Sequence, residues 1–196
     1  MKLLGIDFSL NSTGICLLDS ESNKWKTAIV SPKKLRGDDR LLFHEKYAAH
    51  YAKMAQFAVI EDYAMGIRGG MSFSIGEGCA MWKTQLKKKN VPYILVSPTQ
   101  LKKWAFGKGN VKKDTMYART FIKLWSGREY GTFPEDSFKK DDEIDAFLLA
   151  TVGKYYYNKQ IPPLKYQEEI LKKIIGATKD DSSKANGNKS KRIKRS

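Results

Sequence analysis

Short apolar runs that alternate with longer amphipathic segments are the feature that most limits the folds open to this chain. Three runs stand close together near the N-terminus and two more follow later, at residues 2–9, 13–18, 25–30, 57–60 and 91–96. Runs this short, bounded by turn residues, are typical of buried strands. Tight turns separate the first three, so the sequence predicts that they form an antiparallel meander.

Apolar residues at helical spacing fill much of the remaining chain. They predict helices over residues 40–54, 71–89, 97–104, 112–125, 141–157 and 161–175. Asp38 or Asp39 is available as the N-cap of the first helix, and Ser97 with Pro98 opens the third. This order of strands and helices predicts an α/β layer fold around a mixed sheet.

The charge of the chain indicates the class of its partner. The 196 residues carry 36 Lys plus Arg against 21 Asp plus Glu, a net charge of +15, which favours nucleic acid as the first candidate. Residues 182–196 hold six basic residues and no acid, which leaves +9 on the rest of the chain. We therefore predict a globular domain of residues 1–176 and a disordered basic tail of residues 177–196. The tail either keeps the chain in solution or attracts phosphates, and the positive body favours the second.

Cysteine usage and hydropathy exclude several classes of protein. Cys16 and Cys79 lie in apolar surroundings and are too few for a disulfide framework or a cysteine zinc site, so we expect reduced core thiols. No stretch reaches the roughly 18 apolar residues of a membrane span. Asp7 interrupts the first apolar run before a signal-like segment develops. The sequence therefore predicts a cytoplasmic protein without a membrane partner.

Four acidic residues stand where an α/β fold exposes chemistry. Asp7 ends the first apolar run, Glu61 follows the fourth, and Asp142 and Asp145 share one face at the start of helix 141–157. Carboxylates with no nearby His or Cys suit Mg²⁺ or Mn²⁺. Two such ions about 3.5–4 Å apart can activate a water and stabilise the leaving oxygen of a phosphodiester.

Each acid also has a plain structural explanation. Asp7 can be a solvated strand end, and Asp142 can be an early-turn acid favoured by the helix dipole. That explanation is weaker for Glu61, which follows four apolar residues, and for Asp145, which has apolar neighbours on both sides. Two further acids at this helix start fall on other faces, and we expect both to be solvated: Asp141 and Glu143.

Several short segments, in order over residues 1–157, match the motifs of one known family. They are Gly5 to Ser9 with Thr13 and Gly14, Ile60 with Glu61, Ser97 and Pro98 with Leu101 and Lys102, residues 107–113, and residues 142–146. Together they resemble the RuvC-type Holliday junction resolvases of the RNase H-like superfamily. An insertion-like stretch over residues 125–140 and the basic tail depart from the family pattern and leave junction selectivity open. A compact, lysine-rich chain of this kind is similar to phage or mobile-element members, which implies the cytoplasm of a bacterial cell or phage-infected host.

The resemblance implies an RNase H-like α/β fold with a five-stranded mixed sheet flanked by helices. It further implies a homodimer and Mg²⁺-dependent, symmetric nicking of four-way DNA junctions, with Mn²⁺ able to substitute. The metal-binding carboxylates of the family match Asp7, Glu61, Asp142 and Asp145 by position, and a family lysine matches Lys113. On this hypothesis Asp7 bridges two ions, Glu61 and Asp145 each support one, and Asp142 completes the cluster. Lys113 then offsets charge on the scissile phosphate.

Candidate substrate contacts lie in two glycine-rich segments. Around Arg68, five glycines within residues 64–78 let the backbone approach a phosphate closely. Phe73 either stacks on an unpaired base at the branch point or packs in the core. Lys108 and Lys112 favour phosphate contacts, with a solvated charge run as the alternative.

Other conspicuous residues have structural explanations. We expect His44 and His50 to be surface or packing residues rather than ligands. The tryptophans are most simply core or dimer-interface residues: Trp82, Trp104 and Trp125. The basic cluster of residues 87–89 suits the solvated end of a helix.

Three rival functions stay open. The chain could be a broader nuclease on branched or flap DNA or on RNA in hybrids. It could also be a nuclease-like fold that only binds junctions, although four well-placed carboxylates argue against this. A sugar-kinase-like ATPase begins with a similar strand and hairpin, but the chain is too short for the two domains of those enzymes.

Overall fold

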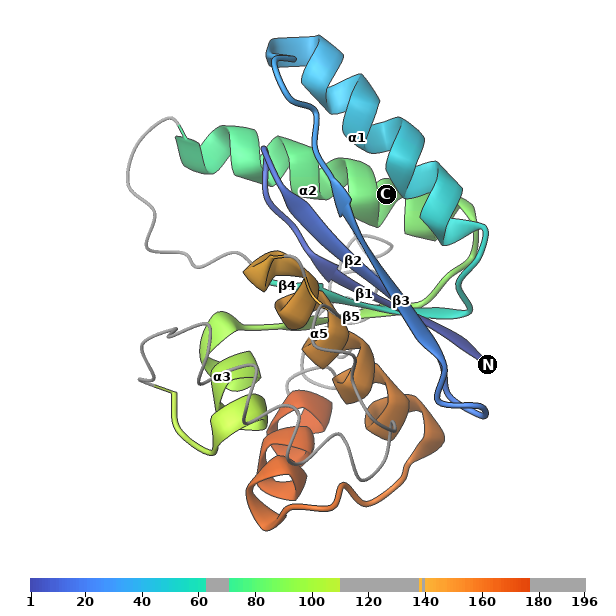
Figure 1. Cartoon of the computed structure of the whole chain (residues 1–196), viewed down its shortest axis with the longest axis vertical. Helices are drawn as coiled ribbons and strands as arrows, with labels where there is room; N and C mark the ends of the chain where they lie inside the picture. The colour runs from blue at the N-terminus through green and yellow to red at the C-terminus, as the bar shows by residue number, and fades with distance from the viewer. Residues whose placement is uncertain (63–70, 110–137, 139, 177–196) are drawn as a thin grey trace, which may run out of the picture.

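A five-stranded mixed sheet forms the centre of the fold (Figure 1). The computed structural model describes residues 1–62, 71–109, 138 and 140–176. Within them the strand order is β3-β2-β1-β4-β5. The strands β1, β2 and β3 form an antiparallel meander, as the sequence predicted. The strands β4 and β5 run parallel to β1, so the sheet is mixed, which was also predicted. The bounds are β1 (Lys2–Asp7), β2 (Thr13–Asp19), β3 (Trp25–Val30), β4 (Phe57–Glu61) and β5 (Tyr93–Val96).

Helices cover both faces of the sheet. One face carries α1 (Gly37–Ala52) and α2 (Met71–Lys88), and the other carries α3 (Pro98–Phe106), α5 (Asp141–Asn158) and a last helix over residues 165–176. These bounds agree closely with the helices predicted over the described residues. The predicted helix over residues 112–125 and nearly all of the insertion-like stretch lie outside the described residues, as does the tail.

The start of α1 corrects one prediction. The helix begins at Gly37 after Arg36, so Asp38 and Asp39 lie in its first turn and neither is the N-cap. An acidic side chain is stabilised both at the N-cap and in the first turn, because both positions lie close to the positive end of the helix dipole. The α3 prediction is confirmed: the Ser97 side chain accepts a hydrogen bond from the Gln100 amide at 3.3 Å, and Pro98 is the first helical residue.

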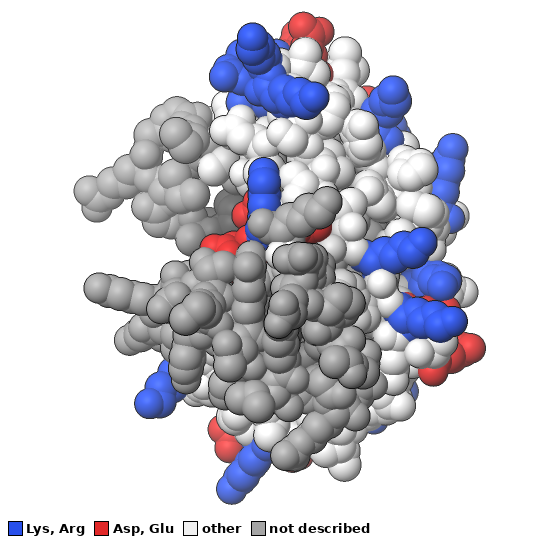
Figure 2. Space-filling view, in the orientation of Figure 1, with Lys and Arg blue, Asp and Glu red and all other residues white. Residues whose placement is uncertain are grey.

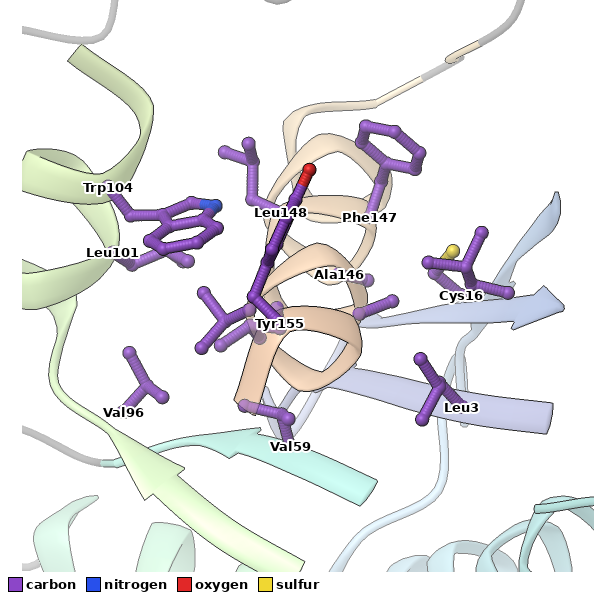
Figure 3. Packing of buried hydrophobic residues seen from close by; sticks show 14 of the residues in the cluster. Leu3, Cys16, Val59, Val96, Leu101, Trp104, Ala146, Phe147, Leu148 and Tyr155 are labelled. Atoms are coloured by element: carbon purple, nitrogen blue, oxygen red, sulfur yellow. The ribbon is translucent and has the colours of Figure 1, made fainter. Parts of the chain in front are cut away.

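Two apolar clusters alternate along the strands with a period of two. On β1 and β4, Leu3 and Val59 belong to the cluster under α3 and α5, whereas Leu4 and Ile60 belong to the cluster under α1 and α2. Successive side chains of a strand point to opposite faces, so both faces of this sheet are buried. Figure 3 shows α5 at the centre of the first cluster, with Trp104 of α3 on one side of the helix and Leu3 and Cys16 of the strands on the other.

The helix α5 lies directly on the backbone of β1 and β2, because both strands have glycine at the contact. A Cβ built on Gly5 would stand 1.9 Å from the carbonyl oxygen of Ala146, and one on Gly14 would stand 2.0 Å from that of Asp142. Gly14 pairs with Asp7 at the carboxyl end of β1. The first turn of α5 therefore covers the carboxyl end of β1, and the helix runs antiparallel to that strand.

Buried thiols and tryptophans occupy the core as predicted. Cys16 and Cys79 are buried and unpaired, and burial raises the pKa of both thiols, so they stay protonated. Trp82 and Trp104 are fully buried. Among the helices of the described residues, none is long and apolar enough to cross a membrane.

Candidate active site

Asp7 and Glu61 end neighbouring parallel strands at the same level. Ile6 of β1 is in register with Ile60 of β4, and each acid is the next residue of its strand. The period of two gives Asp7 the same face as Leu3, and Glu61 the same face as Val59. Both strand-end acids therefore belong to the face of the sheet that α5 covers.

The first turns of α5 bring two more acids to this edge. The backbone of Asp142 lies against Gly14, the pairing partner of Asp7, and Asp145 follows one turn later. Asp7 and Asp145 are both buried, each with 8% of its surface exposed. The four predicted acids thus come from three elements, and their backbones lie at one edge of the sheet.

Figure 2 shows acidic atoms near the middle of the visible face, where Figure 1 draws the start of α5. Lys and Arg side chains stand at the top, along the right-hand side and at the lower left of the same view. Basic side chains and these acidic atoms therefore lie on the same visible face. A polyanion drawn to this face would meet the carboxylates at its centre.

A serine holds one of the four carboxylates. The Ser12 hydroxyl donates a hydrogen bond of 2.5 Å to Oδ2 of Asp142, which stands 130 residues away in the sequence. Ser12 lies in the turn between β1 and β2, the turn that follows Asp7. This contact ties the turn to the start of α5.

The prediction that Glu143 is solvated is wrong. Glu143 has 5% of its surface exposed, and its carboxylate accepts hydrogen bonds of 3.0 Å from the Thr27 hydroxyl and from the Lys140 amide. The reason is that β3 passes beside the first turn of α5. Its Thr27 hydroxyl donates to Glu143 on the helix face that the sequence spacing predicted to be exposed to solvent. Glu143 is therefore an anchor of α5 on the sheet. Asp141, the other acid expected in solvent, is partly exposed.

The chemistry of the donor set fits a hard cation. The four acids offer only carboxylate oxygens, which Mg²⁺ and Mn²⁺ prefer. Among the described residues, however, no three His, Cys, Asp or Glu side chains form a group close enough to hold a metal ion. The sheet edge therefore holds carboxylates of the type that Mg²⁺ and Mn²⁺ prefer, but among the described residues these side chains are not grouped closely enough to surround an ion.

Candidate DNA contacts divide between the described residues and the rest of the chain. Phe73, in the first turn of α2, has 77% of its surface exposed, which excludes the core contact that the sequence left open. The helix α2 packs against the end of β1 on the face opposite α5, because a Cβ on Gly78 would stand 2.5 Å from the ring of Phe8, the residue after Asp7. Lys108 is exposed just beyond the C-cap of α3. Three other predicted contacts lie outside the described residues: Arg68, Lys112 and Lys113.

The two histidines lie on α1, as packing and surface residues. His50 is exposed. His44 is fully buried, with Nε2 at 3.2 Å from the carbonyl oxygen of Leu10. A carbonyl only accepts, so Nε2 carries the proton and donates it. Burial lowers the pKa of His44, although the hydrogen bond to Leu10 acts in the opposite direction.

Sequence reasoning missed the residues that support the acids. Ser12 and Glu143 act through partners more than 100 residues away, and no local spacing reveals such pairs. The one local signal was glycine inside two apolar strands, at Gly5 and Gly14. Glycine at such positions marks a close approach of another backbone, which is what α5 makes.

Comparison with solved structures shows which proteins share this fold. RuvC of Thermus thermophilus superposes with a TM-score of 0.64 at 16% sequence identity, over 84% of this chain and 100% of that one. The chain has the fold of the RuvC resolvases. The same RuvC in complex with Holliday junction substrate gives a TM-score of 0.65 at 14% identity, over 84% of this chain and 99% of RuvC.

A viral resolvase adds a second comparison. The fowlpox virus resolvase in complex with Holliday junction DNA superposes with a TM-score of 0.51 at 17% identity, over 80% of this chain and 99% of the viral one. No protein-family model and no curated protein matches the sequence. The predicted α/β fold with a five-stranded mixed sheet is thus confirmed, and it is shared with RuvC at 14–16% sequence identity.

Proposed function

We propose that the protein is a metal-dependent endonuclease that resolves four-way DNA junctions by symmetric phosphodiester hydrolysis. The observation that carries the proposal is that β1, β4 and α5 bring four acidic residues to one edge of the sheet. The RuvC and fowlpox resolvase structures that share this fold were each solved with Holliday junction DNA. Net positive charge and the exposed aromatic ring of Phe73 fit the same substrate.

The carboxylates would hold Mg²⁺, or Mn²⁺ in its place. Asp7 at the centre would contact both ions, Glu61 and Asp145 would each hold one, and Asp142 would complete the set. When bound, the metal pair lowers the pKa of the attacking water and stabilises the leaving 3′ oxygen. We assign Lys113 to the scissile phosphate, where its charge would offset the charge that develops during hydrolysis.

The burial of Asp7 and Asp145 suits this role. Each has 8% of its surface exposed, so little water competes for the carboxylates. Like charges in a confined site disfavour one another, and a divalent cation relieves the repulsion. The chain therefore gathers negative charge at a point where it needs a cation or a proton to balance it.

We propose that DNA is held on both sides of the acidic edge. Phe73 is placed to stack on an unpaired base, since it is exposed on the helix that packs beside Phe8. Arg68, Lys108 and Lys112 would contact phosphates, and the basic tail of residues 177–196 would add attraction that does not depend on sequence. These contacts position the backbone of a junction arm without reading its bases.

A homodimer would supply two such sites. A four-way junction has twofold symmetry, and a twofold protein dimer presents its sites to opposing strands. We propose that this dimer acts in the cytoplasm of a bacterial cell or a phage-infected host.

A cleavage assay on a synthetic mobile four-way junction tests the proposal. The wild-type chain is incubated with the junction in Mg²⁺ and in EDTA, and nicks are mapped on all four strands. A flap and an RNA–DNA hybrid of matched sequence serve as comparison substrates. We expect paired nicks in opposing strands in Mg²⁺ only. Scattered cuts, or equal cutting of flap or hybrid, would point to a broader nuclease, and binding without cleavage in either metal would point to a non-catalytic junction binder.

A further inference from the structure

The turn between β1 and β2 joins two of the proposed metal ligands. Asp7 is the last residue of β1, and Ser12 stands just before β2. The Ser12 hydroxyl donates a hydrogen bond of 2.5 Å to Oδ2 of Asp142, which lies in the first turn of α5. One short turn therefore follows the proposed ligand Asp7 at its start and, through Ser12 at its end, hydrogen-bonds the proposed ligand Asp142.

Contacts from the surrounding elements hold this turn in place. The Thr13 hydroxyl donates to the Ser9 carbonyl oxygen at 2.7 Å and accepts from the Ser9 amide at 3.3 Å. Beyond β3, the Ser31 hydroxyl donates to the carbonyl oxygen of Asn11 at 2.9 Å. A turn whose backbone is bonded to its neighbours presents its next side chain, that of Ser12, in a fixed place.

The helix α1 adds a buried contact to the same turn. His44 Nε2 donates to the Leu10 carbonyl oxygen at 3.2 Å, and its ring meets that of Phe8 edge to face at 5.2 Å. His44 has no exposed surface, so this contact is shielded from water. The turn is thus held by β2, by the end of β3 and by α1 before any substrate arrives.

We propose that Ser12 is a positioning residue that fixes the Asp142 carboxylate for metal binding; the inference rests on the proposed function. A carboxylate that binds a metal is commonly hydrogen-bonded by an outer residue, which sets its orientation. Ser12 itself touches neither substrate nor metal.

Mn²⁺ binding and cleavage kinetics test this role together. The variants are Ser12→Ala, which removes the hydroxyl, and Ser12→Thr, which keeps it. Ser22→Ala is the matched control, because Ser22 Oγ accepts a local bond from the Lys24 amide in the turn between β2 and β3. Mn²⁺ affinity is measured by titration calorimetry without DNA, and the Mg²⁺ concentration for half-maximal junction cleavage is measured in parallel.

We expect Ser12→Ala to lose about 10–100-fold in Mn²⁺ affinity, as for other outer residues of metal sites, and to need more Mg²⁺ for half-maximal cleavage. High Mg²⁺ should restore part of the rate, KM for the junction should stay unchanged, and Ser12→Thr should behave as wild type. Wild-type Mn²⁺ affinity in a folded Ser12→Ala variant would overturn the inference while leaving the proposed function intact. A wild-type chain that neither binds Mn²⁺ nor cleaves would overturn both.

Discussion

Replacing Gly14 by alanine is the sharpest test of how the fold places its acids. The added Cβ would stand 2.0 Å from the carbonyl oxygen of Asp142, whereas ordinary contact begins at 3.4 Å. The two backbones must therefore separate by about 1.4 Å. Neither is a flexible side chain, so α5 has to move away from β2 at the turn that carries Asp142.

This displacement should affect stability and activity by different amounts. Overpacking of this kind costs about 1–3 kcal/mol, which lowers the midpoint of thermal unfolding by about 2–4 °C per kcal/mol in a chain of this size. A shift of about 1 Å in a catalytic group can cost about 100-fold in rate. The assay is single-turnover cleavage of a four-way junction in Mg²⁺, with the unfolding midpoint measured on the same preparation.

Gly153→Ala is the matched control. It adds a methyl group at the same interface, at the far end of α5, where the Cβ would stand 2.9 Å from Cγ2 of Val59. A side-chain methyl can give way, so we expect a smaller loss of stability and a rate close to wild type. A Gly14→Ala variant that unfolds at a lower temperature yet cleaves at the wild-type rate would refute the argument that the seating of α5 positions the acids.

Three other changes probe the substrate surface and the interior. Phe73→Ala should weaken junction binding by the about 1–3 kcal/mol of one stacked base, measured by gel shift, while Phe73→Trp binds normally and neither changes the unfolding midpoint, because the ring is 77% exposed. His44 has a pKa lowered from 6.5, so unfolding takes up a proton and stability falls as pH drops below about 6.5. When the free energy of unfolding is measured with urea between pH 5 and pH 8, this loss of stability at low pH should be absent from His44→Gln. Truncation after Gly176 should reduce the steepness with which junction affinity falls as salt rises; an unchanged slope would remove the tail from the DNA contacts.

The strand-end acids could be predicted because their placement depends on local pattern. Asp7 and Glu61 each follow an apolar run of a buried strand, and parallel neighbours end at the same edge of a sheet. The start of α5 was equally accessible, since acids in a first turn precede a long apolar helix. The same patterns supplied the number of strands and the order of the elements.

The supporting contacts could not be predicted, because they depend on tertiary packing. Glu143 is buried because Thr27 of β3 lies beside it, 116 residues away. Ser12 meets Asp142 only because Gly5 and Gly14 let α5 approach the strands. The environment of Lys113 and Arg68 lies outside the described residues, so their assignments stay predictions.

The central claim is that the carboxylates gathered at the end of β1 cut DNA, and Asp7→Asn tests it most directly. The substitution keeps the size of a side chain with 8% exposure and removes its charge. The measurement is single-turnover cleavage of a four-way junction in Mg²⁺, with junction binding and the unfolding midpoint as controls. We predict that the folded variant binds the junction and that its cleavage rate falls by about 1000-fold or more. Cleavage at the wild-type rate by that folded variant would contradict the account.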